Sequence, residues 1–132
     1  MCYTTSMNQH IMIDLETLAT TIDANVLTIG ALKFDPRQDY TNWKWGDFPI
    51  DQVFYRRIDP ETGTAIGLKN DDETIGWWAK QSDEVKAEAF SDEHRYSIDE
   101  VFRDFYKFCL TGKYFWAQGV AFDTVICEQV FK

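Results

Sequence analysis

The alternation of apolar and polar positions gives the first part of the chain a strand-rich character. Three short, mainly apolar runs at residues 10–15, 26–34 and 52–58 predict strands. The second run ends at Asp35-Pro36, which is a turn signal, and polar segments separate the runs. We therefore expect these three strands to pair as the antiparallel start of one sheet.

Helical periodicity follows in the second part of the chain. Apolar spacing predicts two short helices at residues 74–81 and 82–90. Ser97 and Glu100 form a capping box, which marks the start of a longer amphipathic helix. Gly112 follows the last apolar position of that helix and predicts its end.

The remaining segments complete the expected topology. Residues 60–71 contain two glycines and are interpreted as a loop, residues 114–117 as a fourth strand, and residues 122–131 as a last helix. The resulting order is β-β-β-α-β-α. This order predicts an α/β fold in which helices cover the faces of a mixed sheet.

Composition is that of one small folded domain. The 132 residues are 45% hydrophobic and 16% aromatic, and the formal net charge is −9. This charge argues against the broad basic groove of tight nucleic-acid binders. It does not exclude a nuclease, because bound metal ions supply local positive charge.

The cysteines and the hydropathy pattern favour a cytoplasmic protein. Cys2, Cys109 and Cys127 are odd in number and contain no Cys-x-x-Cys pair, which fits reduced thiols. We expect no signal peptide, because no basic region followed by an apolar segment opens the chain. We also expect no membrane contact, because no apolar run approaches ~18 residues.

Candidate chemistry lies at the end of the first expected strand. Asp14 and Glu16 follow an apolar run at spacing i, i+2, so their side chains point to the same side of the sheet. Two adjacent carboxylates repel each other and need a compensating cation. The pair predicts half of a Mg²⁺ or Mn²⁺ site. An ordinary acidic strand end remains the alternative, since Asp-x-Glu also occurs at residues 59–61 and 71–73.

A third carboxylate follows the fourth expected strand. Asp123 lies in the first turn of the last expected helix, where it would favour the helix dipole. If the fourth strand neighbours the first, Asp123 also lies beside Asp14. Three carboxylates at the ends of adjacent strands would then form an oxygen-ligand site for Mg²⁺ or Mn²⁺.

These residues carry a family resemblance. Residues 14–17 (Asp-Leu-Glu-Thr) resemble the first motif of the DEDD superfamily of 3′–5′ exonucleases, and Phe122-Asp123 resembles the second. The stretch 74–82, which contains Trp-Trp-x-x-Gln, is similar to the phage and prophage exonucleases, a group similar to a mycobacterial 3′–5′ exoribonuclease. The resemblance covers about residues 8–132 and implies a ribonuclease H-like fold.

The resemblance also implies an activity. Asp14, Glu16 and Asp123 would bind two Mg²⁺ or Mn²⁺ ions and hydrolyse a single-stranded nucleic acid from its 3′ end to nucleoside 5′-monophosphates. The choice between RNA and DNA stays open, because the sequence identifies no residue that contacts the 2′-hydroxyl group. A homodimer is expected only by analogy with related exonucleases.

Further residues are candidates for substrate contact. Leu18 would wedge against the terminal base, and Trp77 and Gln81 would line the path of the strand. The alternative for a tryptophan on a helix is a place in the core, which we favour for Trp78 and weigh equally for Trp77. The complete set of expected substrate contacts is Thr17, Leu18, Trp77, Gln81 and Phe122.

Two departures from the family pattern matter. Gly119 stands where related sequences often have asparagine, and the third motif, a His or Tyr with a final Asp, is absent between Asp123 and Lys132. His94 and Asp99 match its spacing but precede the second motif, so we interpret them as a coincidence. We expect a single exonuclease domain, residues 1–132, without its C-terminal part. The alternative is a catalytically incomplete fragment or a non-catalytic module that binds a metal or a partner.

Overall fold

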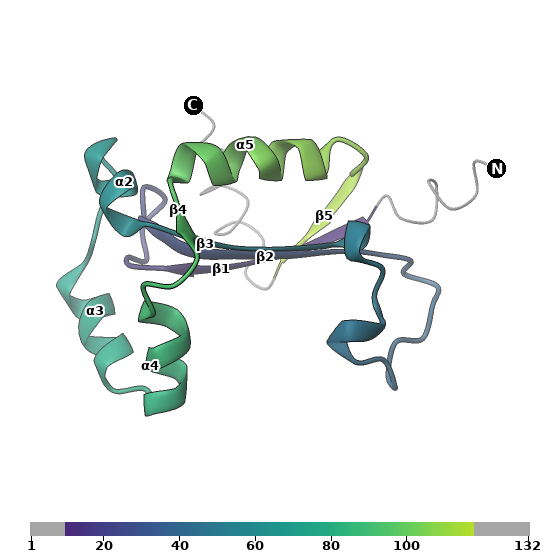
Figure 1. Ribbon diagram of the computed structural model, residues 1–132, viewed down its shortest axis with the longest axis horizontal. Helices are drawn as coiled ribbons and strands as arrows, with labels where there is room; N and C mark the ends of the chain where they lie inside the picture. The colour runs from purple at the N-terminus through teal and green to yellow at the C-terminus, as the bar shows by residue number, and fades with distance from the viewer. Residues whose placement is uncertain (1–9, 118–132) are drawn as a thin grey trace.

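The computed structural model describes residues 10–117, which form one mixed five-stranded sheet with helices on its faces (Figure 1). The strands lie in the order β4-β3-β2-β1-β5. The pairs β1–β2 and β2–β3 are antiparallel, whereas β3–β4 and β1–β5 are parallel. The bounds are β1 (His10–Thr17), β2 (Val26–Phe34), β3 (Val53–Ile58), β4 (Arg95–Tyr96) and β5 (Tyr114–Trp116).

This arrangement confirms the expected α/β class and is consistent with a ribonuclease H-like fold. The antiparallel start and the placement of the fourth expected strand beside the first are both confirmed. The two-residue strand β4 was not expected, because a strand this short leaves no periodicity in the sequence. The expected last helix at 122–131 lies outside the described residues.

The helices divide between the two faces of the sheet (Figure 1). One face is covered by α5, whereas α3 and α4 lie on the other side at one end of the sheet, and the segment between β2 and β3 lies on that other side at the opposite end. None of the helices within residues 10–117 has the length and apolar character needed to cross a membrane. The bounds are η1 (Trp45–Asp47), η2 (Ile50–Gln52), α2 (Pro60–Ala65), α3 (Asp72–Ala79), α4 (Asp83–Phe90) and α5 (Ile98–Cys109).

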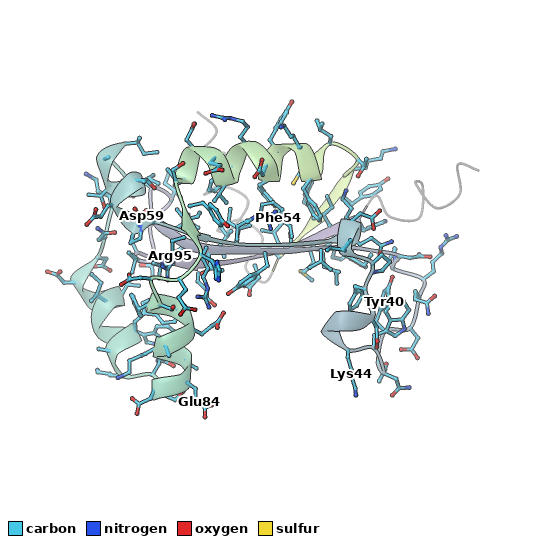
Figure 2. The ribbon with its side chains drawn as sticks, viewed as in Figure 1. Tyr40, Lys44, Phe54, Asp59, Glu84 and Arg95 are labelled. Atoms are coloured by element: carbon cyan, nitrogen blue, oxygen red, sulfur yellow. The ribbon has the colours of Figure 1, made fainter. Side chains whose placement is uncertain are left out.

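The main core lies between the sheet and α5. Ile11 and Ile13 of β1 are buried there with Phe105 of α5, and Figure 2 shows Phe54 of β3 on the same side of the sheet. Because side chains alternate along a strand, the intervening residues of β1 point to the opposite face. That face therefore receives Met12, which is 42% exposed, and the acidic pair that follows it.

Three helix starts follow from capping residues. The Ser97 hydroxyl accepts a hydrogen bond from the Glu100 backbone N–H at 3.3 Å, which confirms the capping serine of α5. Ser82 caps α4 in the same way. The side chain of Asp71 accepts a hydrogen bond from the backbone N–H of Glu73, so this acidic stretch is the start of α3.

One expected loop is wrong. Within 60–71, residues Pro60–Ala65 form the short helix α2. Asp59 caps it by accepting a hydrogen bond from the Glu61 backbone N–H at 3.1 Å, and Pro60 occupies its first turn, where a missing N–H costs nothing. The helix is followed by Gly67 at φ 95°, a conformation that favours glycine.

A buried asparagine fastens α2 to the connection between β1 and β2. Asn25 is fully buried, and its Nδ2 donates to the Pro60 carbonyl at 2.8 Å and to Asn70 Oδ1 at 3.0 Å. Its own backbone carbonyl accepts from the Leu18 backbone N–H at 2.9 Å. This network fixes the segment that immediately follows the acidic end of β1.

The close approach of α2 to Asn25 predicts a sensitive position. A Cβ atom on Gly63 would lie 1.9 Å from Asn25 Oδ1, so Gly63→Ala forces the packing apart and lowers the free energy of unfolding by about 1–3 kcal/mol. Gly76→Ala in α3 is the matched control. Nothing lies within 4 Å of its new Cβ, and alanine should stabilise the helix by up to about 1 kcal/mol. Urea denaturation of both variants measures this, and equal effects would contradict it.

Candidate active site

The acidic pair lies on the sheet face opposite α5. In the β1–β2 register Asp14 pairs with Gly30, and Glu16 pairs with Thr28. Both carboxylates line a first pocket of about 460 Å³, together with Tyr55 of β3. Its floor is open because Gly30 has no side chain and lies between Asp14 and Tyr55 in the register of the three strands.

A second pocket adjoins the first at Glu16. It has a volume of about 590 Å³ and lies between the end of β1 and helix α3. Thr17, Glu73 and Trp77 are among its lining residues. Because Glu16 lines both pockets, this residue lies where the two meet.

The surroundings of Glu16 disfavour its charged form. Its Oε2 is buried and has no hydrogen-bond partner among the described residues. This burial raises the pKa of Glu16, and the negative charge of Asp14 raises it further. The hydroxyl of Thr28 opposes the shift by its proximity, although Thr28 Oγ1 does not meet hydrogen-bond geometry. An unpartnered buried carboxylate oxygen is costly unless a cation compensates it.

The donor set suits a hard divalent cation, because carboxylate oxygens are the ligands that Mg²⁺ and Mn²⁺ prefer. Within residues 10–117 no group of three His, Cys, Asp or Glu residues could hold a metal ion. The third predicted ligand, Asp123, lies outside the described residues, as does Phe122. Strand β5, which precedes them, runs parallel to β1 with Trp116 level with Met12.

Leu18, which the resemblance places at the terminal base, is buried in the described structure. It is only 6% exposed and packs in a second apolar cluster with Leu27, Trp78 and Ala89. The expected contact of Leu18 with the terminal base stays a prediction. The expected core position of Trp78 is confirmed at 8% exposure, and its Nε1 donates to the Thr17 carbonyl at 2.9 Å.

The other predicted substrate contacts within the described residues do not all line the second pocket. Thr17 and Trp77 line the second pocket, and Trp77 is 55% exposed. The Thr17 hydroxyl donates to the Ala19 carbonyl at 2.8 Å. Gln81 is not among the lining residues of this pocket, and its Nε2 donates to the Trp77 carbonyl at 3.1 Å. The structure therefore places the exposed Trp77 ring in the pocket that Glu16 also lines.

A polar cluster on the same face of the sheet was not predicted from the sequence. The Tyr55 hydroxyl donates to Glu88 of α4 at 2.5 Å, and the Arg57 guanidinium forms an ion pair with the same carboxylate at 2.8 Å. These two donors lower the pKa of Glu88. The i, i+2 spacing of Tyr55 and Arg57 places them on one face of β3, but no sequence pattern pairs them with a helix 33 residues away.

The raised pKa of Glu16 predicts a pH-dependent gain from its neutral isostere. In EDTA, Glu16→Gln should be more stable than the unaltered chain at neutral pH, since it removes a charge that folding disfavours. A raised folded-state pKa costs stability above that pKa, and the cost disappears as pH falls to the unfolded value near 4.5. Thermal melts across this range should show the advantage shrinking toward acid. A constant difference, or a less stable variant, would contradict the assignment.

Fold and site together define an α/β protein with a carboxylate pair on strand β1, between β2 and β5 of its mixed sheet. The comparison with known families matches residues 9–132 to the 3′-5′ exoribonuclease Rv2179c-like domain. This match covers nearly the whole chain, so the chain belongs to this 3′–5′ exoribonuclease family. The expected resemblance to a 3′–5′ exoribonuclease is thereby confirmed at the level of the family. No curated protein matches the chain.

Proposed function

We propose that the chain is a metal-dependent 3′–5′ exoribonuclease of the DEDD type, akin to the phage and prophage enzymes. It hydrolyses single-stranded RNA from the 3′ end to nucleoside 5′-monophosphates, and Asp14, Glu16 and Asp123 hold two Mg²⁺ or Mn²⁺ ions. The observation that carries the proposal is the pair of carboxylates on one pocket wall, one of them with an unpartnered buried oxygen. The family match supports the direction of cleavage and the choice of RNA.

Each residue of the described site has a role in this proposal. Asp14 is exposed in the first pocket, so it reaches ions and phosphate from solvent. Glu16, where the two pockets meet, orients the attacking water toward the scissile phosphorus. Ions held by these carboxylates would lower the pKa of that water and would stabilise charge on the attacking and leaving oxygens. The pockets on either side of Glu16 accept neighbouring nucleotides.

Trp77 supplies the main contact to a base. Its ring is half exposed in the second pocket and is braced edge-to-face against Trp78 at 5.0 Å between centroids. Stacking a base on such a ring contributes about 1–3 kcal/mol and is tolerant of sequence. This fits an enzyme that shortens single strands one nucleotide at a time.

Charge makes the proposed activity dependent on metal. The chain carries −9 overall, and Asp14, Glu16 and Glu73 line the two pockets. An RNA phosphate entering these pockets without cations is repelled by every one of these groups. Chelation should therefore abolish cleavage and weaken the binding of the 3′ end.

The test is digestion of a 5′-labelled single strand, as RNA and as DNA, in Mn²⁺ or in EDTA. A ladder that shortens from the 3′ end of RNA only in the presence of metal supports the proposal. A folded chain that binds Mn²⁺ and leaves both strands intact contradicts it and indicates a binding module or an incomplete enzyme. Sedimentation of the same sample tests the homodimer that analogy with related exonucleases leads us to expect.

A further inference from the structure

A third pocket lies at the outer edge of the sheet and has a different chemical character. Its volume is about 490 Å³, and we call it the edge pocket. Basic and aromatic side chains dominate its wall, although the chain as a whole is acidic. The lining residues are Tyr55, Arg56, Arg57, Glu93, His94 and Tyr96.

The edge pocket is built by the short pairing of β4 with β3. These strands pair only through Arg57–Arg95 and Ile58–Tyr96, so among the described strands the outer edge of β3 is open before Arg57. His94 turns the chain into β4 at φ 57°, a left-handed conformation uncommon for histidine. This leaves a notch in the sheet edge, and the notch is lined by residues of β3, of the turn before β4 and of β4 itself.

The notch is held rigidly. Arg95 donates to the carbonyls of Ser91, at 2.6 Å, and Ile58, at 2.9 Å, and also to that of Ala89. Figure 2 shows Arg95 where the sheet edge meets α4. These bonds join the end of α4, the end of β3 and the start of β4, so the wall of the pocket needs no ordering when a ligand binds.

The two arginines of the edge pocket differ in how far the described residues already engage them. Arg56 lies 4.8 Å over the Phe54 ring and donates one N–H to the Tyr55 carbonyl at 2.9 Å. Arg57 is paired with Glu88 and donates to the Glu93 carbonyl at 3.4 Å. A guanidinium has further N–H groups in a planar fork that suits phosphate oxygens. The carboxylates of Glu88 and Glu93 are the opposing charges nearby.

Tyr55 joins the edge pocket to the carboxylate site, because it lines both the edge pocket and the first pocket. From β1 to β3 the sheet crosses two strand spacings, roughly 10 Å. We propose that the edge pocket is a subsite for the phosphate backbone of single-stranded RNA, a few nucleotides upstream of the 3′ end. This inference rests on the proposed function, since it takes the RNA 3′ end to lie at Asp14 and Glu16.

The composition of the pocket matches that ligand. Grooves that bind single strands combine positive charge for the backbone with aromatic rings for the bases, and Tyr96, at 44% exposure, adds such a ring. Arg56, Arg57 and His94 contact phosphate oxygens, and Tyr55 carries the strand from one pocket to the next. An acidic exoribonuclease thereby holds RNA without a broad basic surface.

The test measures binding by fluorescence anisotropy in Mn²⁺. The probes are a 5′-labelled RNA of about ten nucleotides, within the site sizes of single-strand grooves, and a dinucleotide, both with a cleavage-resistant 3′ linkage. Arg56→Gln should weaken binding of the longer RNA about tenfold and leave the dinucleotide unchanged. The slope of log affinity against log salt should fall by about 0.7 for each phosphate that the variant no longer neutralises.

Matched variants separate the effect of the edge pocket on RNA binding from the effect of net charge. Arg103→Gln removes an arginine that is 64% exposed on α5 and is not among the lining residues of the edge pocket, and it should change nothing. Glu93→Gln should tighten binding of the longer RNA. His94→Asn, which tolerates the left-handed conformation, provides a second variant if Arg56→Gln unfolds. Equal losses in Arg56→Gln and Arg103→Gln, or equal affinity for both probes, would overturn the subsite.

Failure of the edge-pocket subsite and failure of the proposed exoribonuclease activity would give different results. Mn²⁺ affinity and 3′-end cleavage report on Asp14 and Glu16, and Arg56→Gln should leave Mn²⁺ affinity intact. Length-dependent RNA binding that requires Arg56, in a chain that does not cleave, overturns the activity and keeps the RNA subsite. Metal-dependent cleavage with no gain in affinity from length keeps the activity and overturns the subsite.

Discussion

Asp14→Asn should lose Mn²⁺ affinity by at least about a hundredfold, and 3′-end cleavage should fall below detection. The substitution keeps the shape of the side chain and removes the charge that faces the first pocket. Even residues that only support metal ligands cost about 10–100-fold in affinity when they are changed, so a direct ligand should cost more. Glu16 alone, with its pKa raised by burial, would be a weaker anchor for a cation.

Calorimetric titration with Mn²⁺ measures the effect of Asp14→Asn, and thermal melts check that the variant folds. Asp99→Asn is the control, since its side chain is 82% exposed on α5 and forms only a surface ion pair with Arg103. It removes one negative charge far from the pocket. The site assignment is lost if the two variants bind Mn²⁺ equally well.

The carboxylate pair was predictable because its arrangement depends only on residues that are close in the sequence. Alternation along one strand places Asp14 and Glu16 on the same face, and buried isoleucines fix which face that is. The neighbours across the sheet, Gly30 and Thr28, depend on register. Register is set by the whole hydrophobic pattern and the turns, so the sequence defined the pair but not the pocket around it.

The features that the sequence did not predict are formed by segments that lie far apart in the sequence. Glu88 reaches Tyr55 and Arg57 only because α4 packs at one end of the sheet, and the edge pocket exists only because β4 is short. Helix α2 is a different case. Its signal, Asp59 before Pro60, is a cap followed by a first-turn proline, and the two glycines nearby obscured it.

Leu18 is buried, although the resemblance leads us to expect a contact with a base. Its position after the acidic pair matches the family, but in the described structure its side chain fills the cluster beneath Trp78. The backbone explains this placement. Leu18 donates its N–H to the Asn25 carbonyl, and its own carbonyl accepts from Asp71, so the chain turns inward at this residue. Apolar side chains at an inward turn are buried when a cluster is available.

The adjacent tryptophans of α3 should respond in opposite ways to alanine substitution. Trp78→Ala should lower the free energy of unfolding by about 3–5 kcal/mol, because it empties a buried site and removes the hydrogen bond to Thr17. Trp77→Ala should change stability by about 0.5 kcal/mol or less, because its ring is 55% exposed. Urea denaturation of both variants measures this difference.

For RNA binding by folded variants, we expect substitution of Trp77 to have a larger effect than substitution of Trp78. Trp77→Ala removes the ring that lines the second pocket and should weaken binding of a single strand by about 1–3 kcal/mol, whereas Trp78→Phe, which keeps the packing, should bind nearly as well as the unaltered chain. The phenylalanine variant loses the hydrogen bond that holds the Thr17 carbonyl beside Glu16. Any loss it shows should therefore appear in cleavage rather than in affinity. A Trp77→Ala variant that binds RNA undiminished would remove Trp77 from the substrate path and leave the second pocket without its aromatic contact.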